Sequence, residues 1–85
     1  MVGLATLTSP RGHSMHKDAI LEELGRVERD VVEAERQLAE QEALLVALER
    51  QDGDTSKART VLDMMREAQQ RRQAERQRLL SLLQP

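Results

Sequence analysis

Apolar residues in the first half of the chain recur alternately four and three positions apart. This spacing places them on one face of an α-helix and is typical of a helix that packs along another helix. The pattern predicts a first helix over about residues 17–51. Its series is Ile20, Leu24, Val27, Val31, Ala34, Leu38, Gln41, Leu45 and Leu48, in which Gln41 alone is polar.

A second series of the same spacing follows in the last third of the chain, and it predicts a second helix over about residues 56–83. The middle of this series is polar, so its apolar face is less well defined. The series is Ala58, Val61, Met65, Ala68, Arg72, Glu75, Leu79 and Leu82.

A short connection at residues 52–55 separates the two predicted helices. Gly53 fits the left-handed position that closes many helices, and Thr55 fits the N-cap of the next helix, with Asp54 adding a favourable negative charge. So short a connection forces the helices to run antiparallel. The sequence therefore predicts an all-α, coiled-coil-like hairpin over residues 17–85. Its seam is expected to contain Leu24, Val27, Val31, Leu38, Leu45, Leu48, Val61, Met65, Leu79 and Leu82.

Charge differs strongly between the two predicted helices. Residues 17–50 hold five basic and ten acidic residues, a net charge of −5, whereas residues 56–83 hold seven basic and three acidic residues, a net charge of +4. Antiparallel pairing is expected to bring Glu28 near Arg76 and Asp30 near Arg78. Each exposed ion pair contributes only about 0.2–1 kcal/mol, so these pairs select register and orientation more than they stabilise.

The apolar surface near the connection exceeds what a lone hairpin can bury. Residues 43–48 are apolar on every side of the helix, and a segment of this kind is usually covered by more than one neighbour. Leu44, Val46 and Met64 lie off the expected seam and are the predicted contacts with a partner. Dimerisation into a four-helix bundle is the simplest way to cover them, and another helical protein is the alternative partner.

Residues 1–16 contain Pro10, Gly3 and Gly12 and no acidic residue, and we interpret them as a disordered N-terminal tail. Met15 directly precedes the first predicted helix and is an alternative start of the chain. His13 and His16 have a spacing that could hold a metal on a helix, but two ligands in a tail make a poor site.

The composition argues against an enzyme. The 85 residues include no Cys, so no thiolate nucleophile or cysteine-based zinc site exists, and no catalytic arrangement of nucleophile and base is recognisable. Asp52, Asp54, Ser56 and Asp63 partly match a calcium loop, but Lys57 stands where that loop needs Gly. We expect no catalytic residue, no metal and no cofactor.

The remaining function classes are binding functions. The chain carries neither an apolar run long enough for a membrane span nor a secretory signal, so we expect a cytoplasmic protein without a membrane partner. A non-enzymatic protein–protein interaction or oligomerisation module is the leading interpretation. The alternative is a nucleic-acid accessory protein that uses the Arg-rich second helix, although the chain lacks aromatic residues on which bases stack and its net charge is −2.

The stretch from Val31 to Leu62 resembles small uncharacterised helical-hairpin proteins of alphaproteobacteria. These share a Glu-x-Glu-Arg segment, an apolar run that ends in Leu-Glu-Arg, and a Gly-x-Asp-Thr-like turn. The corresponding segments here are residues 33–36, 43–50 and 53–55. The second helix departs from the family, because Met65, Gln69 and arginines replace its aromatic residue and histidines. The resemblance implies a helical hairpin in a bacterial cytoplasm and no catalytic residue.

Overall fold

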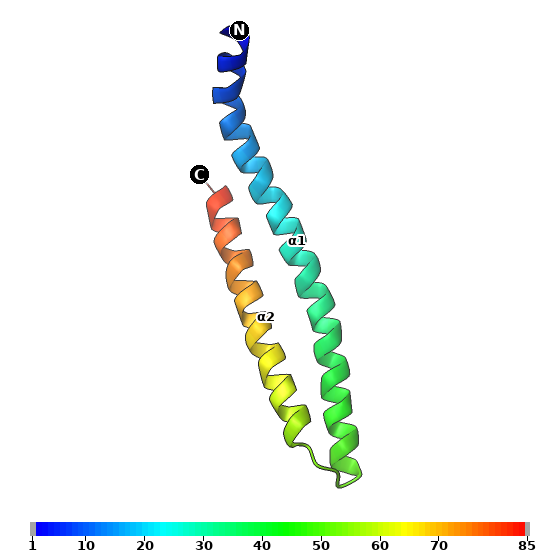
Figure 1. Ribbon diagram of the computed structural model, residues 1–85. Helices are drawn as coiled ribbons and strands as arrows, with labels where there is room; N and C mark the ends of the chain where they lie inside the picture. The colour runs from blue at the N-terminus through cyan, green and yellow to red at the C-terminus, as the bar shows by residue number, and fades with distance from the viewer. Residues whose placement is uncertain (1, 85) are drawn as a thin grey trace.

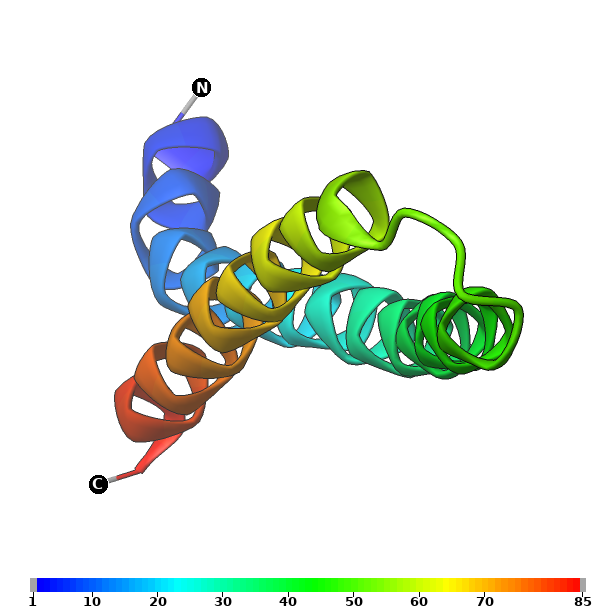
Figure 2. The same cartoon turned by 90° about the horizontal axis from the view of Figure 1, so that it is seen from below.

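The computed structural model describes residues 2–84 of the chain, with side chains described from His16 onwards. Two helices, α1 (Val2–Arg50) and α2 (Ser56–Leu83), run antiparallel and pack against each other, and residues 51–55 connect them (Figure 1). The molecule measures 73 × 24 × 15 Å. Seen along its length, the helices cross at an angle (Figure 2). The predicted all-α two-helix architecture and the bounds of the second helix are confirmed.

The first helix begins earlier than the sequence predicted. α1 starts at Val2, so the backbone is helical through the segment expected to be a disordered tail. This extension reaches past the end of α2 in Figure 1. Adding residues to an existing helix costs far less than nucleating a new one, which explains how α1 continues beyond its partner.

The seam of α1 follows the predicted series. Ile20, Leu24, Val27 and Ala34 are buried. The remaining members, Val31, Leu38, Gln41, Leu45 and Leu48, are half-buried. At the end away from the connection, Leu79 of α2 completes a core cluster with Ile20, Leu24 and Val27.

The seam of α2 differs from the prediction at every second position. Leu62 is 3% exposed whereas Val61 is 38% exposed, and Leu82 is 51% exposed whereas its neighbour Leu83 is half-buried. The expected seam positions Val61 and Leu82 were therefore wrong. The observed seam still has the four–three spacing, but it runs through Ala58, Leu62, Met65, Gln69, Arg72, Arg76, Leu79 and Leu83.

Two glutamine side chains make the polar positions of the seam compatible with burial. The Gln69 side chain, 7% exposed, donates a hydrogen bond to the Val31 carbonyl at 3.0 Å, and Gln41 donates to the Ala58 carbonyl at 3.1 Å. Each bond crosses from one helix to the other. A polar group satisfied in this way favours one register over its neighbours, because a slipped pairing would leave the amide unpaired.

The connection closes α1 with a six-residue hydrogen-bonded cap. The Gly53 N–H donates to the Leu48 carbonyl at 2.8 Å, and the Asp52 N–H donates to the Glu49 carbonyl at 3.2 Å, the pattern of a Schellman motif. The left-handed residue is Asp52, with φ of 55°, so the prediction of Gly53 at that position was wrong. Gly53 instead suits close approach, because a Cβ there would lie 3.4 Å from the Leu48 carbonyl oxygen.

The N-terminus of α2 is capped by two adjacent residues. Thr55 occupies the N-cap position, as predicted, but its side chain makes no capping hydrogen bond. The Asp54 carboxylate accepts the Ser56 N–H at 3.0 Å instead. This bond lowers the pKa of Asp54, because it favours the ionised carboxylate.

Candidate interaction surface

The two sides of the helix pair differ in chemistry. Along one side, carboxylates of α1 meet arginines of α2, and we call this side the charged flank. Its ion pairs are Glu49–Arg59 at 2.6 Å, Glu42–Arg66 at 3.0 Å and Glu28–Arg76 at 3.2 Å. The charged flank has therefore already satisfied much of its own charge.

The two ion pairs predicted between the helices have different outcomes. Glu28–Arg76 is confirmed. Asp30–Arg78 was wrong, because Arg78 pairs with Glu75 in its own helix at 2.7 Å. Residues three apart on a helix are close neighbours, so this pair forms without bringing two helices together.

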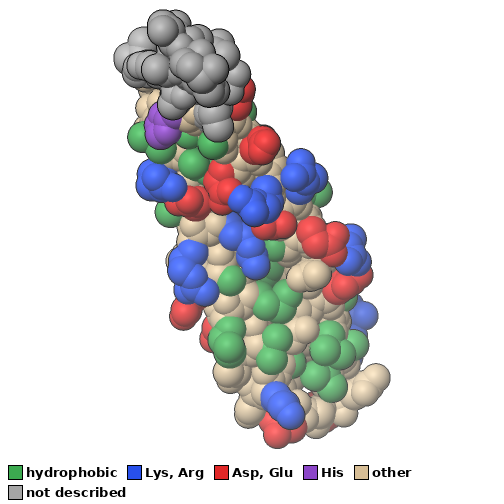
Figure 3. Space-filling view, turned by 45° about the horizontal axis from the view of Figure 1, so that its top comes forward, with side chains coloured by type: hydrophobic (Ala, Val, Ile, Leu, Met, Phe, Trp, Pro, Cys, Tyr) green, Lys and Arg blue, Asp and Glu red, His purple; other side chains and the backbone are tan. Residues whose placement is uncertain are grey.

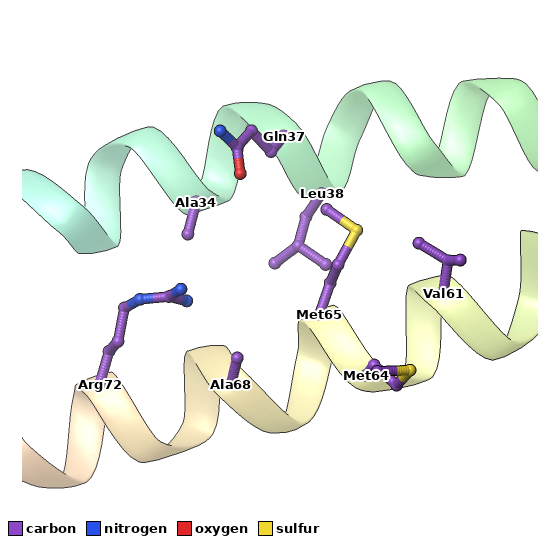
Figure 4. Close-up of a pocket in the computed structure, with 8 residues that line it drawn as sticks. All are labelled: Ala34, Gln37, Leu38, Val61, Met64, Met65, Ala68 and Arg72. Atoms are coloured by element: carbon purple, nitrogen blue, oxygen red, sulfur yellow. The ribbon is translucent and has the colours of Figure 1, made fainter.

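The opposite side carries an open groove of about 240 Å³ between the helices, and we call it the groove flank. Leu38 and Met65 point towards each other across its floor, and Arg72 reaches towards Ala34 at one end (Figure 4). The groove is lined by Ala34, Gln37, Leu38, Val61, Met64, Met65, Ala68 and Arg72. This surface is mostly apolar and has one guanidinium at its end.

On this side of α2, Arg71 and Arg72 have no carboxylate within salt-bridge distance among the described side chains. Arg72 is half-buried and donates to the Gln69 side-chain oxygen at 3.2 Å. Guanidinium groups favour carboxylate partners with planar, paired hydrogen bonds. The groove flank can therefore accept an acidic group from outside the chain.

The three residues predicted to contact a partner are all exposed: Leu44 by 49%, Val46 by 44% and Met64 by 62%. The structure does not gather all three on one side. Met64 lines the groove, whereas Leu44 and Val46 are about 200° apart around α1, since successive residues are about 100° apart. One partner helix can therefore cover Leu44 or Val46 but not both.

A space-filling view shows that apolar and charged side chains are also separated along the length of the molecule. On the face in Figure 3, hydrophobic side chains gather over the half nearer the connection, while acidic and basic side chains dominate the other half. On this face the exposed apolar surface is thus concentrated in the half nearer the connection. Contiguous apolar patches on a protein of this size usually mark an interaction site.

The described carboxylates whose pKa is clearly shifted all have a lowered pKa. The pKa of Glu33 is lowered by its hydrogen bond to Arg36, and the pKa of Glu75 is lowered by its hydrogen bond to Arg78. Both groups are therefore ionised near neutral pH and stand on exposed helix surface, whereas a general acid needs a pKa raised towards the working pH. No cluster that could hold a metal ion occurs among the described side chains, and His13 lies outside them.

Sequence reasoning did not identify the groove, because it assigned Val61 and Ala68 to the seam. A usable signal was present in the charges. Arg59 comes directly after the observed seam position Ala58, and Arg66 directly after Met65. Both arginines pair with glutamates of α1. Placing these arginines on the charged flank would have rotated α2 and put Val61 on the other side.

Comparison of the chain with protein-family models, characterised proteins and solved structures found no match. The resemblance to alphaproteobacterial hairpin proteins therefore stays a prediction. In the described part of the chain, no helix combines the length and the apolar character that a membrane span requires.

Proposed function

We propose that this chain is a non-enzymatic interaction module that self-associates through apolar surface its own hairpin leaves open. The observation that carries this proposal is the exposure of Leu44, Val61 and Met64 beside a groove of apolar character. Each helix in a hairpin can bury one stripe of side chains against the other. The remaining stripe is covered only when further helices pack on it, as in a four-helix bundle.

Energetic considerations support association. A two-helix chain of this size has a small core, and such scaffolds commonly gain stability from oligomerisation. Full burial of a Leu, Val or Met side chain is worth roughly 1.5–3 kcal/mol, so a few from each copy can offset the entropy lost on pairing. The contact of these apolar groups with water is thus unfavourable in the monomer, and their burial would contribute affinity in a complex. A bacterial cytoplasm, which the resemblance implies, is the proposed location.

Sedimentation equilibrium between about 1 and 100 μM tests the proposal, since a micromolar dissociation constant would give mostly dimer at the upper limit. Leu44→Glu and Val46→Glu probe opposite sides of α1, and at least one should weaken association while circular dichroism shows helix content retained. A wild-type chain that stays monomeric at the highest concentration would overturn self-association. Docking on another helical protein would then explain the exposed apolar surface.

The nucleic-acid alternative receives less support. Arg59, Arg66 and Arg76 pair with acidic residues of α1, and Arg78 pairs with Glu75. Few guanidinium groups on α2 are therefore available for phosphates. A gel shift of DNA or RNA at about 50 mM salt, where phosphate contacts are strong, would revive this alternative.

A further inference from the structure

The groove flank presents one column of side chains on each helix. Spacings of three and four residues place Glu33, Gln37, Glu40 and Leu44 on one line along α1, and Val61, Met64, Ala68 and Arg71 on one line along α2. Gln37, Val61, Met64 and Ala68 line the groove directly. The columns therefore border the same surface, with acidic groups on α1 and a basic group on α2.

The shape of this flank suits a second copy of the same surface. Met64 is 62% exposed and stands at the edge of the groove, so the flank offers both a projecting apolar side chain and a hollow. A two-fold symmetric interface needs such self-complementarity, because each copy supplies both halves of every contact. The flank meets that requirement at the half of the hairpin nearer the connection.

Charge distinguishes the two symmetric ways of joining the groove flanks. With the two-fold axis across the helices, α1 would face the second α1, and α2 would face the second α2. With the axis parallel to the helices, each α1 would face the other copy's α2. Residues 17–50 carry a net charge of −5 and residues 56–83 a net charge of +4, so the first arrangement opposes like charges and the second opposes unlike charges.

We propose that a second copy of this chain docks on the groove flank about a two-fold axis parallel to the helices, with both connections at the same end. This inference rests on the self-association proposed above and specifies its surface and geometry. Each α1 then has two antiparallel neighbours, the α2 of its own hairpin and the α2 of the other copy. The assembly is a four-helix bundle whose neighbouring helices are all antiparallel.

This axis keeps every residue at its own level along the bundle. Gln37 and Ala68 border the groove together, so they mark one level. Two turns towards the connection, Leu44 of one copy meets Val61 of the other. One turn the opposite way, Glu33 meets Arg71, a cation with no carboxylate partner within its own described chain. Apolar contact and charge thus select the same arrangement.

Charge reversal across this contact provides a specific test. Glu33→Arg and Arg71→Glu each oppose like charges at two equivalent places in a homodimer, so each should raise the dissociation constant by about tenfold. Mixing the two variants should restore association. In the mixed dimer, the Glu33→Arg chain pairs its new arginine with the new glutamate of the Arg71→Glu chain, and its own Arg71 with the native Glu33.

The outcomes separate this inference from the broader proposal. Wild-type association with no recovery in the mixture overturns the geometry and leaves self-association intact. A monomeric wild-type chain overturns both. Recovery to near the wild-type dissociation constant, observed by sedimentation of the mixture, supports the parallel axis, because the arrangement with the axis across the helices does not bring Glu33 to Arg71.

A matched pair of apolar substitutions tests the surface itself. Met64→Glu places a charge at the edge of the groove and should raise the dissociation constant by at least about tenfold. Val32→Glu makes a comparable change at a side chain 68% exposed and outside the groove, and it should leave association unchanged. Equal weakening by the two variants, with helix content preserved, would show that the groove is not the interface.

Discussion

At the scale of single residues, Asp52 is the one non-glycine residue among those described whose φ is positive, 55°. A left-handed conformation brings Cβ close to the following carbonyl, which costs roughly 1–2 kcal/mol for most L-residues. Asp tolerates this conformation better than most because its short polar side chain can bond locally. The strain is offset by the carbonyls of Leu48 and Glu49, which the Asp52–Gly53 backbone caps.

Replacing Asp52 with Gly should therefore raise the free energy of unfolding by about 1 kcal/mol, since Gly adopts positive φ without a Cβ clash. Urea unfolding at a fixed protein concentration measures the change, because association would otherwise alter apparent stability. Gly53→Ala is the informative comparison and should be mildly destabilising, because its Cβ would lie 3.4 Å from the Leu48 carbonyl oxygen. Destabilisation by Asp52→Gly would contradict this assignment of strain.

Single carboxylates also determine how the hairpin responds to acid. Hydrogen bonds from Arg36 and Arg78 lower the pKa values of Glu33 and Glu75 below their ordinary value of 4.5, and the Ser56 amide lowers that of Asp54 below 3.8. A group whose pKa is lowered by folding stabilises the native state while it is ionised. That contribution is present above the ordinary pKa and is lost as pH falls through the folded-state pKa.

Stability should accordingly be constant near neutral pH and decline from about pH 5 to pH 3. Urea unfolding across this range, at constant ionic strength and protein concentration, gives the profile. Glu75→Gln should flatten part of the decline, since the glutamine side chain does not titrate. A wild-type profile that rises towards pH 3 would contradict the direction derived from these pKa shifts.

At the scale of the helices, the predictability of each element follows from how sharply its apolar stripe is bounded. The α1 series was predicted correctly because charged residues flank Leu24 and Val27 closely. The α2 series was not, because Val61 and Leu62 are adjacent apolar residues between Ala58 and Met65 and fit the spacing equally well. Only the packing of α2 on α1 decides which of them is buried.

The burial of Gln69 illustrates what the apolar pattern alone omits. A glutamine in the seam would count against burial, yet its amide reaches the Val31 carbonyl at 3.0 Å and accepts from Arg72. Likewise, the sequence alone did not show which side of the helix pair carries the groove, because Leu44 and Val46 are both apolar and lie on opposite sides of α1. Hydrophobicity predicted the helices and their pairing, but partners across the interface determined the rotation of α2.

Gln69→Leu tests whether the buried amide specifies register rather than stability. The Val31 carbonyl remains available to its own helix, so replacement by an apolar group should raise the free energy of unfolding by about 1 kcal/mol. The register should become less unique, which would appear as broadened or doubled amide resonances by NMR. Gln70→Leu, at an exposed neighbouring position, should change stability by less than about 0.5 kcal/mol. A clear loss of stability in Gln69→Leu would show that the hydrogen bond is net stabilising.

At the scale of the whole molecule, the hairpin has a long axis of 73 Å and an asymmetric cross-section of 24 × 15 Å. One flank carries ion pairs between the helices, and the other bears the apolar groove. Pairing through the groove flank would bury apolar surface and leave the charged flanks towards solvent. The opposite net charges of α1 and α2, which favour the pairing of the two helices within one chain, then also select the orientation of the second chain.

The proposed orientation predicts a specific distance between two copies. The chain has no Cys, so Gln84→Cys introduces a single thiol for a spin label near the free end of α2. With both connections at the same end, the two labels sit across the diagonal of a four-helix bundle, and their separation should be roughly 15–30 Å, given spacings of 8–10 Å between neighbouring helix axes. With the axis across the helices and the apolar regions still superposed, the labels would lie at opposite ends of the bundle, about 55 Å apart at a rise of about 1.5 Å per residue. Pulsed electron paramagnetic resonance resolves these two ranges.

The same label on the Met64→Glu chain should show no intermolecular distance, because this substitution is expected to separate the copies. A distribution centred near the longer value in the wild-type background would require the charges of α1 and α2 to be satisfied within each hairpin, and it would overturn the parallel axis.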